Sequence, residues 1–189
     1  MAVQEFIPEL PTFADHPALR NFLEVWNGWR GAAIAPRRAD INPRDIPELM
    51  RGVTLMDAIA PDNLHIRYVG SLLCEIVGQD ITGENYIEFT APEVRNLRAR
   101  RLWGVVSQPA AAVWMSPWEH DAQFVGLSVP VLPSEDALPM KLMQVLIPLR
   151  DTHHMASERK RNPISSVTLS NLFRYVDIGA GKPDTSVEA

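Results

Sequence analysis

The order of extended and helical segments along the chain is the feature that most constrains its fold. Two strand-like runs, residues 53–60 and 64–70, flank Pro61-Asp62-Asn63, whose residue types suit the turn of an antiparallel hairpin. A helical stretch follows, and then three further strand-like runs cover residues 111–119, 123–132 and 140–149. Pairing of the first two strands with the last three gives an α+β fold, a five-stranded antiparallel sheet with helices on one face.

The helices are predicted from apolar spacing and from residues that begin or end helices. Asp15 is placed to cap a first helix that Gly31 ends, and the apolar residues between them recur at i, i+3, i+4 and i+7. These apolar residues are Leu19, Phe22, Leu23 and Trp26. A short helix over residues 71–77 is closed by Gly78. The capping-box spacing from Thr90 to Glu93 predicts a longer helix to about residue 107.

The chain divides into three parts. Residues 1–14 contain two prolines and lack periodicity, so they are expected to form an extended lead-in. Residues 15–150 hold the predicted domain, whose size is usual for a single hydrophobic core. Residues 151–189 are expected to form a polar linker, a C-terminal helix that ends at Gly179, and a disordered tail. The apolar face of that helix is predicted from Leu169, Leu172, Phe173 and Val176.

Composition narrows the classes of function. The formal net charge of −5 argues against nonspecific attraction to nucleic acid or to an anionic membrane, because both need a positive field. The apolar runs are far shorter than the roughly 20 residues of a membrane span, and the N-terminus does not read as a secretory signal. Cys74 is the only cysteine, which excludes an intramolecular disulfide. We therefore expect a cytoplasmic protein.

Motifs that carry catalysis are missing from the sequence. It contains no nucleotide-binding glycine loop, no HExxH and no GxSxG. His153 and His154 are adjacent, so their side chains point in different directions, and this predicts no metal site. Cys74 lies among apolar residues and is expected to be a buried inert thiol, the alternative being a thiolate pair or haem ligand with His65 or His120. We expect neither catalytic residues nor enzymatic activity.

Several short motifs in combination resemble a PAS-like family that is found mainly in alphaproteobacteria. The motifs are Trp26 to Gly31, Pro36 to Ile41, Asp45-Ile46-Pro47, Arg67 to Gly70, and Gly78 to Gly83. The resemblance extends from about Leu19 to Leu149 and agrees with the order of strands and helices. It implies a PAS fold and a role in signalling or regulation by a stand-alone domain, without an attached kinase or cyclase. It supplies no agreed ligand or cofactor and no catalytic residues.

A small molecule is expected to bind in a cavity between the helices and the sheet, where folds of this kind can leave space. The candidate lining residues are Tyr68, Leu73, Tyr86, Trp103, Trp114 and Gln144. In the second strand, Leu64, Ile66 and Tyr68 are expected to share one face, because side chains alternate along a strand.

The apolar stripe of the first helix must be buried, either on its own sheet or on a second chain. The chain resembles PAS-like proteins that dimerise through such flanking helices, which predicts a homodimer. Its candidate interface residues are Leu19, Phe22, Leu23 and Trp26.

The longer helix carries four arginines, Arg95, Arg98, Arg100 and Arg101. They are suited to phosphates or to an acidic partner, but we expect a solvated or ion-paired face. Because the total charge is acidic, nucleic-acid binding through this helix is the least favoured function.

The sequence predicts a regulatory binding module. A ligand in the cavity, or a partner protein, would shift the flanking helices, and a separate signalling protein would detect the change. The alternative is a small α+β enzyme or carrier whose sheet encloses a hydrophobic molecule. A paired acid and base in the interior would favour the enzyme, since a sensor needs only shape and a few polar groups.

Overall fold

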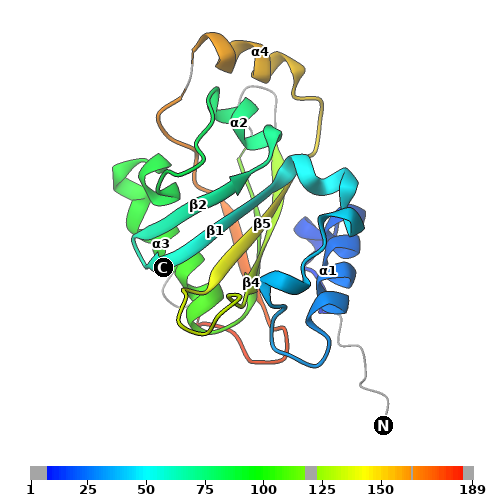
Figure 1. The fold of residues 1–189 in the computed structure, drawn as a ribbon. Helices are drawn as coiled ribbons and strands as arrows, with labels where there is room; N and C mark the ends of the chain where they lie inside the picture. Colours follow the sequence, from blue (N-terminus) through cyan, green and yellow to red (C-terminus); the bar gives the residue numbers. More distant parts are fainter. Residues whose placement is uncertain (1–7, 118–122, 163, 185–189) are drawn as a thin grey trace.

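A six-stranded antiparallel sheet forms the centre of the computed structural model, which describes residues 8–117, 123–162 and 164–184, without the side chains of residues 153–156. Its strand order is β2-β1-β5-β4-β3-β6, with the first hairpin at one edge (Figure 1). The strands are β1 (Val53–Ala60), β2 (Asn63–Val69), β3 (Ala111–Met115), β4 (Phe124–Val131), β5 (Lys141–Pro148) and β6 (Leu172–Val176). The first five overlap the predicted runs, although β3 ends at Met115, before the end of the predicted run 111–119, and the α+β antiparallel class is confirmed.

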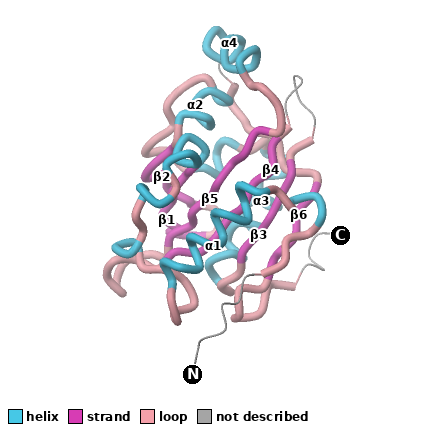
Figure 2. The backbone as a smooth tube through the Cα atoms, turned by 90° about the vertical axis from the view of Figure 1, so that its right-hand side faces the viewer, coloured by secondary structure: helices cyan, strands magenta, loops and turns pink. Residues whose placement is uncertain are grey.

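Helices connect and flank these strands. The α-helices are α1 (Pro17–Arg30), α2 (Ser71–Val77), α3 (Pro92–Ser107) and α4 (His153–Arg161). Short 3-10 helices are η1 (Thr12–Ala14), η2 (Arg38–Asp40), η3 (Pro43–Asp45), η4 (Pro47–Gly52) and η5 (Tyr86–Phe89). Figures 1 and 2 both show α4 beyond α2 at one end of the molecule.

The two faces of the sheet form two separate cores, because successive side chains of a strand point to opposite faces. On β4, Val125, Leu127 and Val129 pack against α1 in one apolar cluster. On β3, Ala112 belongs to the other cluster, which holds buried residues of α2, η5 and α3. The predicted helices between β2 and β3 therefore cover one face together, and α1 covers the opposite face.

Helix α1 is anchored on the sheet by its apolar stripe. Leu19, Phe22, Leu23 and Trp26 are each at most 1% exposed within the single chain, and the Trp26 indole Nε1 donates to the carbonyl oxygen of Pro130 on β4 at 3.2 Å. These four side chains are therefore not available to a second chain, which corrects their assignment as dimer-interface residues. The homodimer itself stays a prediction and would have to use another surface.

The cap of α1 differs from the prediction by one residue. The His16 Nδ1 atom, not the Asp15 carboxylate, accepts from the Ala18 amide at 3.2 Å, and Asp15 forms an ion pair with Arg20 at 2.7 Å. Pro17 occupies the first helical position, where its missing N–H is no loss. Gly31 ends the helix with a φ of +53°, a conformation that glycine adopts easily.

The C-terminal part corrects the sequence prediction in two places. The expected linker contains α4, and the expected helix over residues 169–178 is replaced by strand β6, which pairs antiparallel with β3. The apolar spacing of Leu172, Phe173 and Val176 suits a helix, but β3 has an open edge whose backbone groups need partners. Pairing of β6 satisfies them. Part of the expected tail, residues 185–189, lies outside the described residues.

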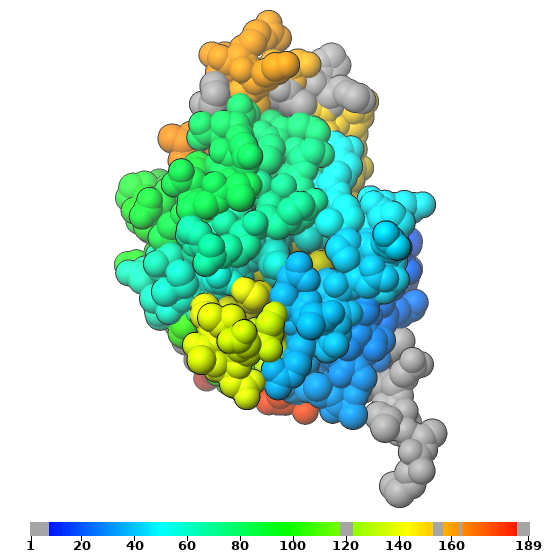
Figure 3. Space-filling view, viewed as in Figure 1, coloured from blue at the N-terminus to red at the C-terminus, as the bar shows by residue number. Residues whose placement is uncertain are grey.

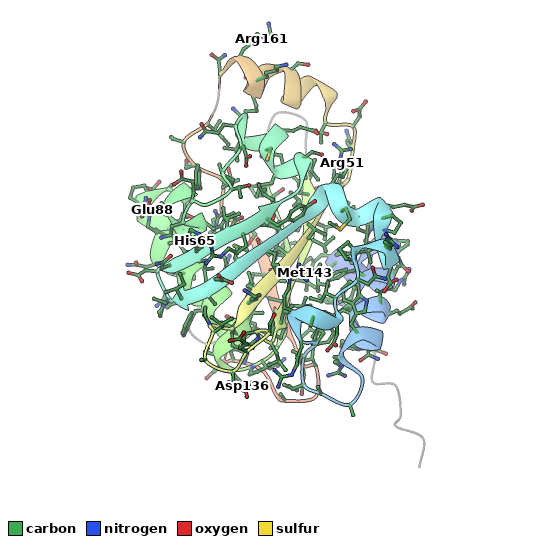
Figure 4. The ribbon with its side chains drawn as sticks, viewed as in Figure 1. Arg51, His65, Glu88, Asp136, Met143 and Arg161 are labelled. Carbon is green, nitrogen blue, oxygen red and sulfur yellow. The ribbon has the colours of Figure 1, made fainter. Side chains whose placement is uncertain are left out.

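The loop between β4 and β5 holds down the segment that follows α1. The Arg38 amide donates to the Leu132 carbonyl at 2.9 Å, and Arg37 forms an ion pair with Asp136 at 3.2 Å. Figure 3 shows this loop, in yellow, against the blue segment that contains Arg37. Asp136 is labelled at the same end of the molecule in Figure 4, opposite to the end that carries Arg161 of α4.

Candidate functional site

A cavity of about 90 Å³ lies between the sheet and the helices α2 and α3. Its floor consists of side chains from the strands, namely Trp114, Phe124, Gln144, Leu146 and Phe173. Its roof consists of Leu73 and Ile76 of α2, Tyr86 of η5, and Arg98, Arg101 and Leu102 of α3. This is the place, between helices and sheet, where the sequence predicted a binding cavity.

The polar part of the floor is organised by one buried hydroxyl. Ser128 on β4 is fully buried, and its Oγ accepts from Gln144 Nε2 at 2.9 Å and from Trp114 Nε1 at 3.3 Å. The two donors lie on β5 and β3, the strands that flank β4. Because both side chains are bonded to one rigid strand, the floor is held in a single arrangement.

A stretch after α4 closes the cavity, and we call residues 164–170 the covering segment. Ile164, Val167, Thr168, Leu169 and Ser170 of this segment line the cavity, as does Arg159 of α4. The Ile164 amide donates to the Val77 carbonyl at 2.9 Å and the Val167 amide to the Phe89 carbonyl at 2.6 Å. The covering segment leads directly into β6, so the cavity roof and the sixth strand are one continuous piece of chain.

Arg98 is the most deeply buried charged group at the cavity. Its side chain donates from Nη1 to Thr90 Oγ1 at 3.0 Å and from Nη2 to the carbonyl oxygen of Thr168 at 2.6 Å. The guanidinium carbon also lies 5.6 Å from the centre of the Tyr86 ring. Arg98 is only 7% exposed, and these partners are neutral. The described lining residues include no aspartate or glutamate.

Arg101 adds a second positive charge one helical turn away. Its Nη1 donates to the carbonyl oxygen of Ser170 at 2.9 Å and to its Oγ at 3.2 Å, and its guanidinium lies 4.8 Å from the centre of the Phe173 ring. Burial lowers the pKa of Arg98, Tyr86 opposes this effect, and the like charge of Arg101 lowers it further. An arginine nevertheless stays protonated in proteins, so Arg98 carries its charge into the interior.

The structure brings four of the six sequence-predicted cavity residues together. Leu73, Tyr86, Trp114 and Gln144 all line the cavity. Trp103 does not, because it lies on another side of α3 in a separate groove beside Tyr175.

Tyr68 also lies away from the cavity, 40% exposed. Leu55 of β1 pairs with Tyr68, but the next residue, Met56, pairs with Ile66. The extra residue, Arg67, is a β-bulge, and it turns Tyr68 out of the face that Ile66 occupies. The assumption that Tyr68 and Ile66 share a face was therefore wrong.

The arginines were not predicted as cavity residues, because a solvated or ion-paired face was expected for them. The spacing did indicate their position at the cavity. Arg101 and Leu102 follow Arg98 by three and four residues, so the three side chains lie on one face of the helix. The covering segment was missed for a different reason: residues 164–170 show no periodicity of their own, and their role depends on contacts with distant elements.

Cys74 is half-buried and lies in a groove between α2 and α4, outside the main cavity. Burial raises the pKa of its thiol, and the nearby Asp80 carboxylate raises it further. A thiol of this kind is a poor nucleophile at neutral pH, as expected from the sequence. His120 lies outside the described residues.

Two further features bear on the class of protein. Within the described ranges, His, Cys, Asp and Glu form no cluster suited to a metal ion. The described helices include none with the length and apolar character that crossing a membrane requires.

The family of the chain follows from its fold and from a comparison with family models. The antiparallel sheet, with helices over one face and a cavity beneath them, is the arrangement that the resemblance to PAS domains implied. The family model for the PAS domain matches residues 14–157, and the chain belongs to this family. No curated protein and no solved structure matches the chain. The PAS class points to a sensory or regulatory module.

Proposed function

We propose that this chain is a sensory PAS module that binds a small molecule in the cavity beneath α3 and reports its presence to a separate signalling protein. The observation that carries the proposal is the covering segment, which closes the cavity and continues into β6. A molecule that enters the cavity must contact this segment. Binding energy can therefore change the position of a surface element.

The chemistry of the cavity suits binding of an organic molecule. Apolar side chains such as Leu73, Leu102 and Phe124 supply most of the wall, and a few fixed polar groups, Gln144 and the arginines, supply orientation. This combination is typical of small-molecule sites. A volume of about 90 Å³ matches a small ligand, and displacement of the covering segment would enlarge the space.

Native mass spectrometry of the purified chain tests the proposal. We expect a retained small molecule, and we expect Leu146→Trp to abolish its retention, because Leu146 lines the cavity and a larger ring fills it. The matched control is Leu138→Trp, in the β4–β5 loop, where the leucine is 48% exposed. Equal retention of the molecule by both variants contradicts the proposal.

Hydrogen exchange distinguishes the sensor from the alternative, a carrier or enzyme that encloses a hydrophobic molecule. In a sensor, removal of the ligand changes the protection of the Val167 amide and of β6. In a simple carrier, the ligand leaves without a lasting change in these amides. The same native spectra give the mass of the assembly, for which we expect a homodimer.

A further inference from the structure

The charge inside the cavity narrows the class of ligand, provided that the proposed function holds. We infer that the cavity binds a small organic carboxylate, with its anionic group between Arg98 and Arg101 and its apolar body against the remaining wall. Arg98 is 7% exposed, and its described contacts are a hydroxyl, a carbonyl oxygen and an aromatic ring. A buried charge without an opposite charge is costly, and an anion in the cavity removes that cost.

The described contacts of Arg98 orient its side chain without neutralising its charge, and hydrogen bonds also orient Arg101. Arg98 is held by Thr90 and Thr168, and Arg101 is held by Ser170. Two of the five N–H groups of Arg98 donate in these bonds, and its guanidinium also lines the cavity. A planar guanidinium fork matches the two oxygens of a carboxylate, which makes the pair suitable for this group.

Like charges on one face of α3 strengthen the case for an anion. The like charge of Arg101 lowers the pKa of Arg98, and Arg159 brings a third guanidinium to the lining. The described lining contains no carboxylate that could pair with Arg98. An anionic group between Arg98 and Arg101 is attracted by both, so its binding is stronger than to either arginine alone.

The rest of the wall determines what else the ligand carries. Leu73, Leu102, Phe124 and Leu146 are apolar, and Trp114 and Phe173 present aromatic rings. A small acid with an aliphatic or aromatic body satisfies both parts of the site. A highly charged phosphate ester would leave most of these apolar side chains without a partner.

Carboxylate binding at this point is coupled to the covering segment. The guanidinium groups of Arg98 and Arg101 also donate to the backbone carbonyls of Thr168 and Ser170. A carboxylate that takes hydrogen bonds from the same groups competes with these carbonyls. Occupancy therefore changes the contacts that hold residues 168–170 against α3.

The test compares acids with their uncharged amides. Benzoate and hexanoate are titrated into the full chain beside benzamide and hexanamide, with inorganic phosphate as a further probe, and binding is followed by calorimetry and by tryptophan fluorescence. We expect at least one acid to bind about ten-fold or more tightly than its amide, because charge-assisted hydrogen bonds are lost in the amide. Inorganic phosphate is expected to bind weakly, since it has no apolar body.

Variants of α3 test the named arginine. Arg98→Met is expected to weaken binding of the acid by about ten-fold or more and to weaken binding of the amide by a smaller factor. Arg98→Lys keeps the charge and is expected to retain part of the affinity. Arg100→Gln is the control, since Arg100 is on the same helix but exposed and outside this cavity. Thermal unfolding of each variant shows whether it is folded.

Each outcome separates the inference from the proposed function. The carboxylate inference is overturned if acid and amide bind with equal affinity, if neither acid binds, or if the retained molecule is neutral. In each of these cases, loss of the retained molecule in Leu146→Trp would still support the sensory cavity. Binding of phosphate as tight as that of the acids, and dependent on Arg98, also overturns the carboxylate assignment. If the Arg98 variants do not fold, the comparison of acid with amide on the unmodified chain decides.

Discussion

The indole ring of Trp114 on β3 lies over Gly126, its cross-strand partner on β4, and occupies the space that a side chain at residue 126 would fill. The same indole donates to Ser128 and lines the cavity. Gly126 therefore determines where one wall of the cavity lies, although it does not line the cavity itself.

Replacement of Gly126 by alanine is expected to displace the Trp114 ring. A Cβ at residue 126 overlaps the ring, so we expect a loss of about 1–3 kcal/mol in the free energy of unfolding. We also expect a changed tryptophan emission spectrum. The control is Gly28→Ala in α1, where no atom lies within 4 Å of the added Cβ and alanine favours the helix. Denaturant unfolding measures both variants, and equal stabilities would contradict the packing described.

Removal of one hydroxyl is expected to loosen the contact of β6 with α3. The Tyr175 hydroxyl donates to the carbonyl oxygen of Arg101 at 2.8 Å, and Gly104 provides the space for its ring. We expect Tyr175→Phe to lower the free energy of unfolding by about 0.5–1.5 kcal/mol. Tyr68→Phe is the matched control, because Tyr68 is exposed and its longer contact with Met50 measures 3.4 Å. Equal effects of the two substitutions would show that β6 is not docked through Tyr175.

The stability of the chain is expected to depend on Asp57 in a defined pH range. Burial raises the pKa of its carboxyl, but hydrogen bonds and charges of Lys141 and Arg67 outweigh this effect, and the net pKa is lowered. The Arg67 Nε donates to Asp57 Oδ2 at 2.5 Å. Since the folded-state pKa lies below the unfolded value of about 3.9, the stabilisation is complete above that value. It is lost as pH falls through the folded pKa.

Asp57→Asn checks this pH dependence. At pH 7 we expect the variant to be less stable by about 1–3 kcal/mol, because Lys141 and Arg67 lose their charged acceptor. The difference should shrink as the pH falls below about 4. The control is Asp62→Asn in the exposed turn between β1 and β2. A difference in stability that does not vary with pH would rule out this role for Asp57.

The reactivity of Cys74 is expected to be low. Because burial and Asp80 raise the pKa of the thiol, the thiolate fraction at pH 7.5 is below that of a free cysteine. We expect alkylation by iodoacetamide to be slower than that of glutathione and to accelerate in Asp80→Asn. The rate as a function of pH gives the apparent pKa, and a value at or below that of a free thiol would contradict the assignment.

Local patterns predicted the first five strands well. The predicted run 53–60 coincides with β1, and the predicted run 140–149 extends one residue beyond β5 at each end. A strand can be identified from alternating apolar and polar residues, or from a short apolar run, when turn residues lie on both sides. These features can be recognised without reference to the rest of the chain. The cavity residues Leu73, Tyr86, Trp114 and Gln144 could be selected from the expected layout of helices over a sheet.

Other residues could not be placed from local patterns. The bulge at Arg67 turns Tyr68 to the opposite face, and no feature of the alternating sequence marks it. Leu172, Phe173 and Val176 have helical spacing, but the open edge of β3 makes them a strand. In both cases a contact with another element outweighs the local preference.

By itself, the amino-acid sequence determined the class of fold, the order of its elements and the acidic overall charge, because these depend on residue types and on their spacing along the chain. Only the tertiary structure decided that the apolar stripe of α1 is buried on its own sheet and that Arg98 points inward. It also decided that residues 164–170 close the cavity. The physical reason is that burial and charge compensation depend on contacts between distant segments, which only the folded chain brings together.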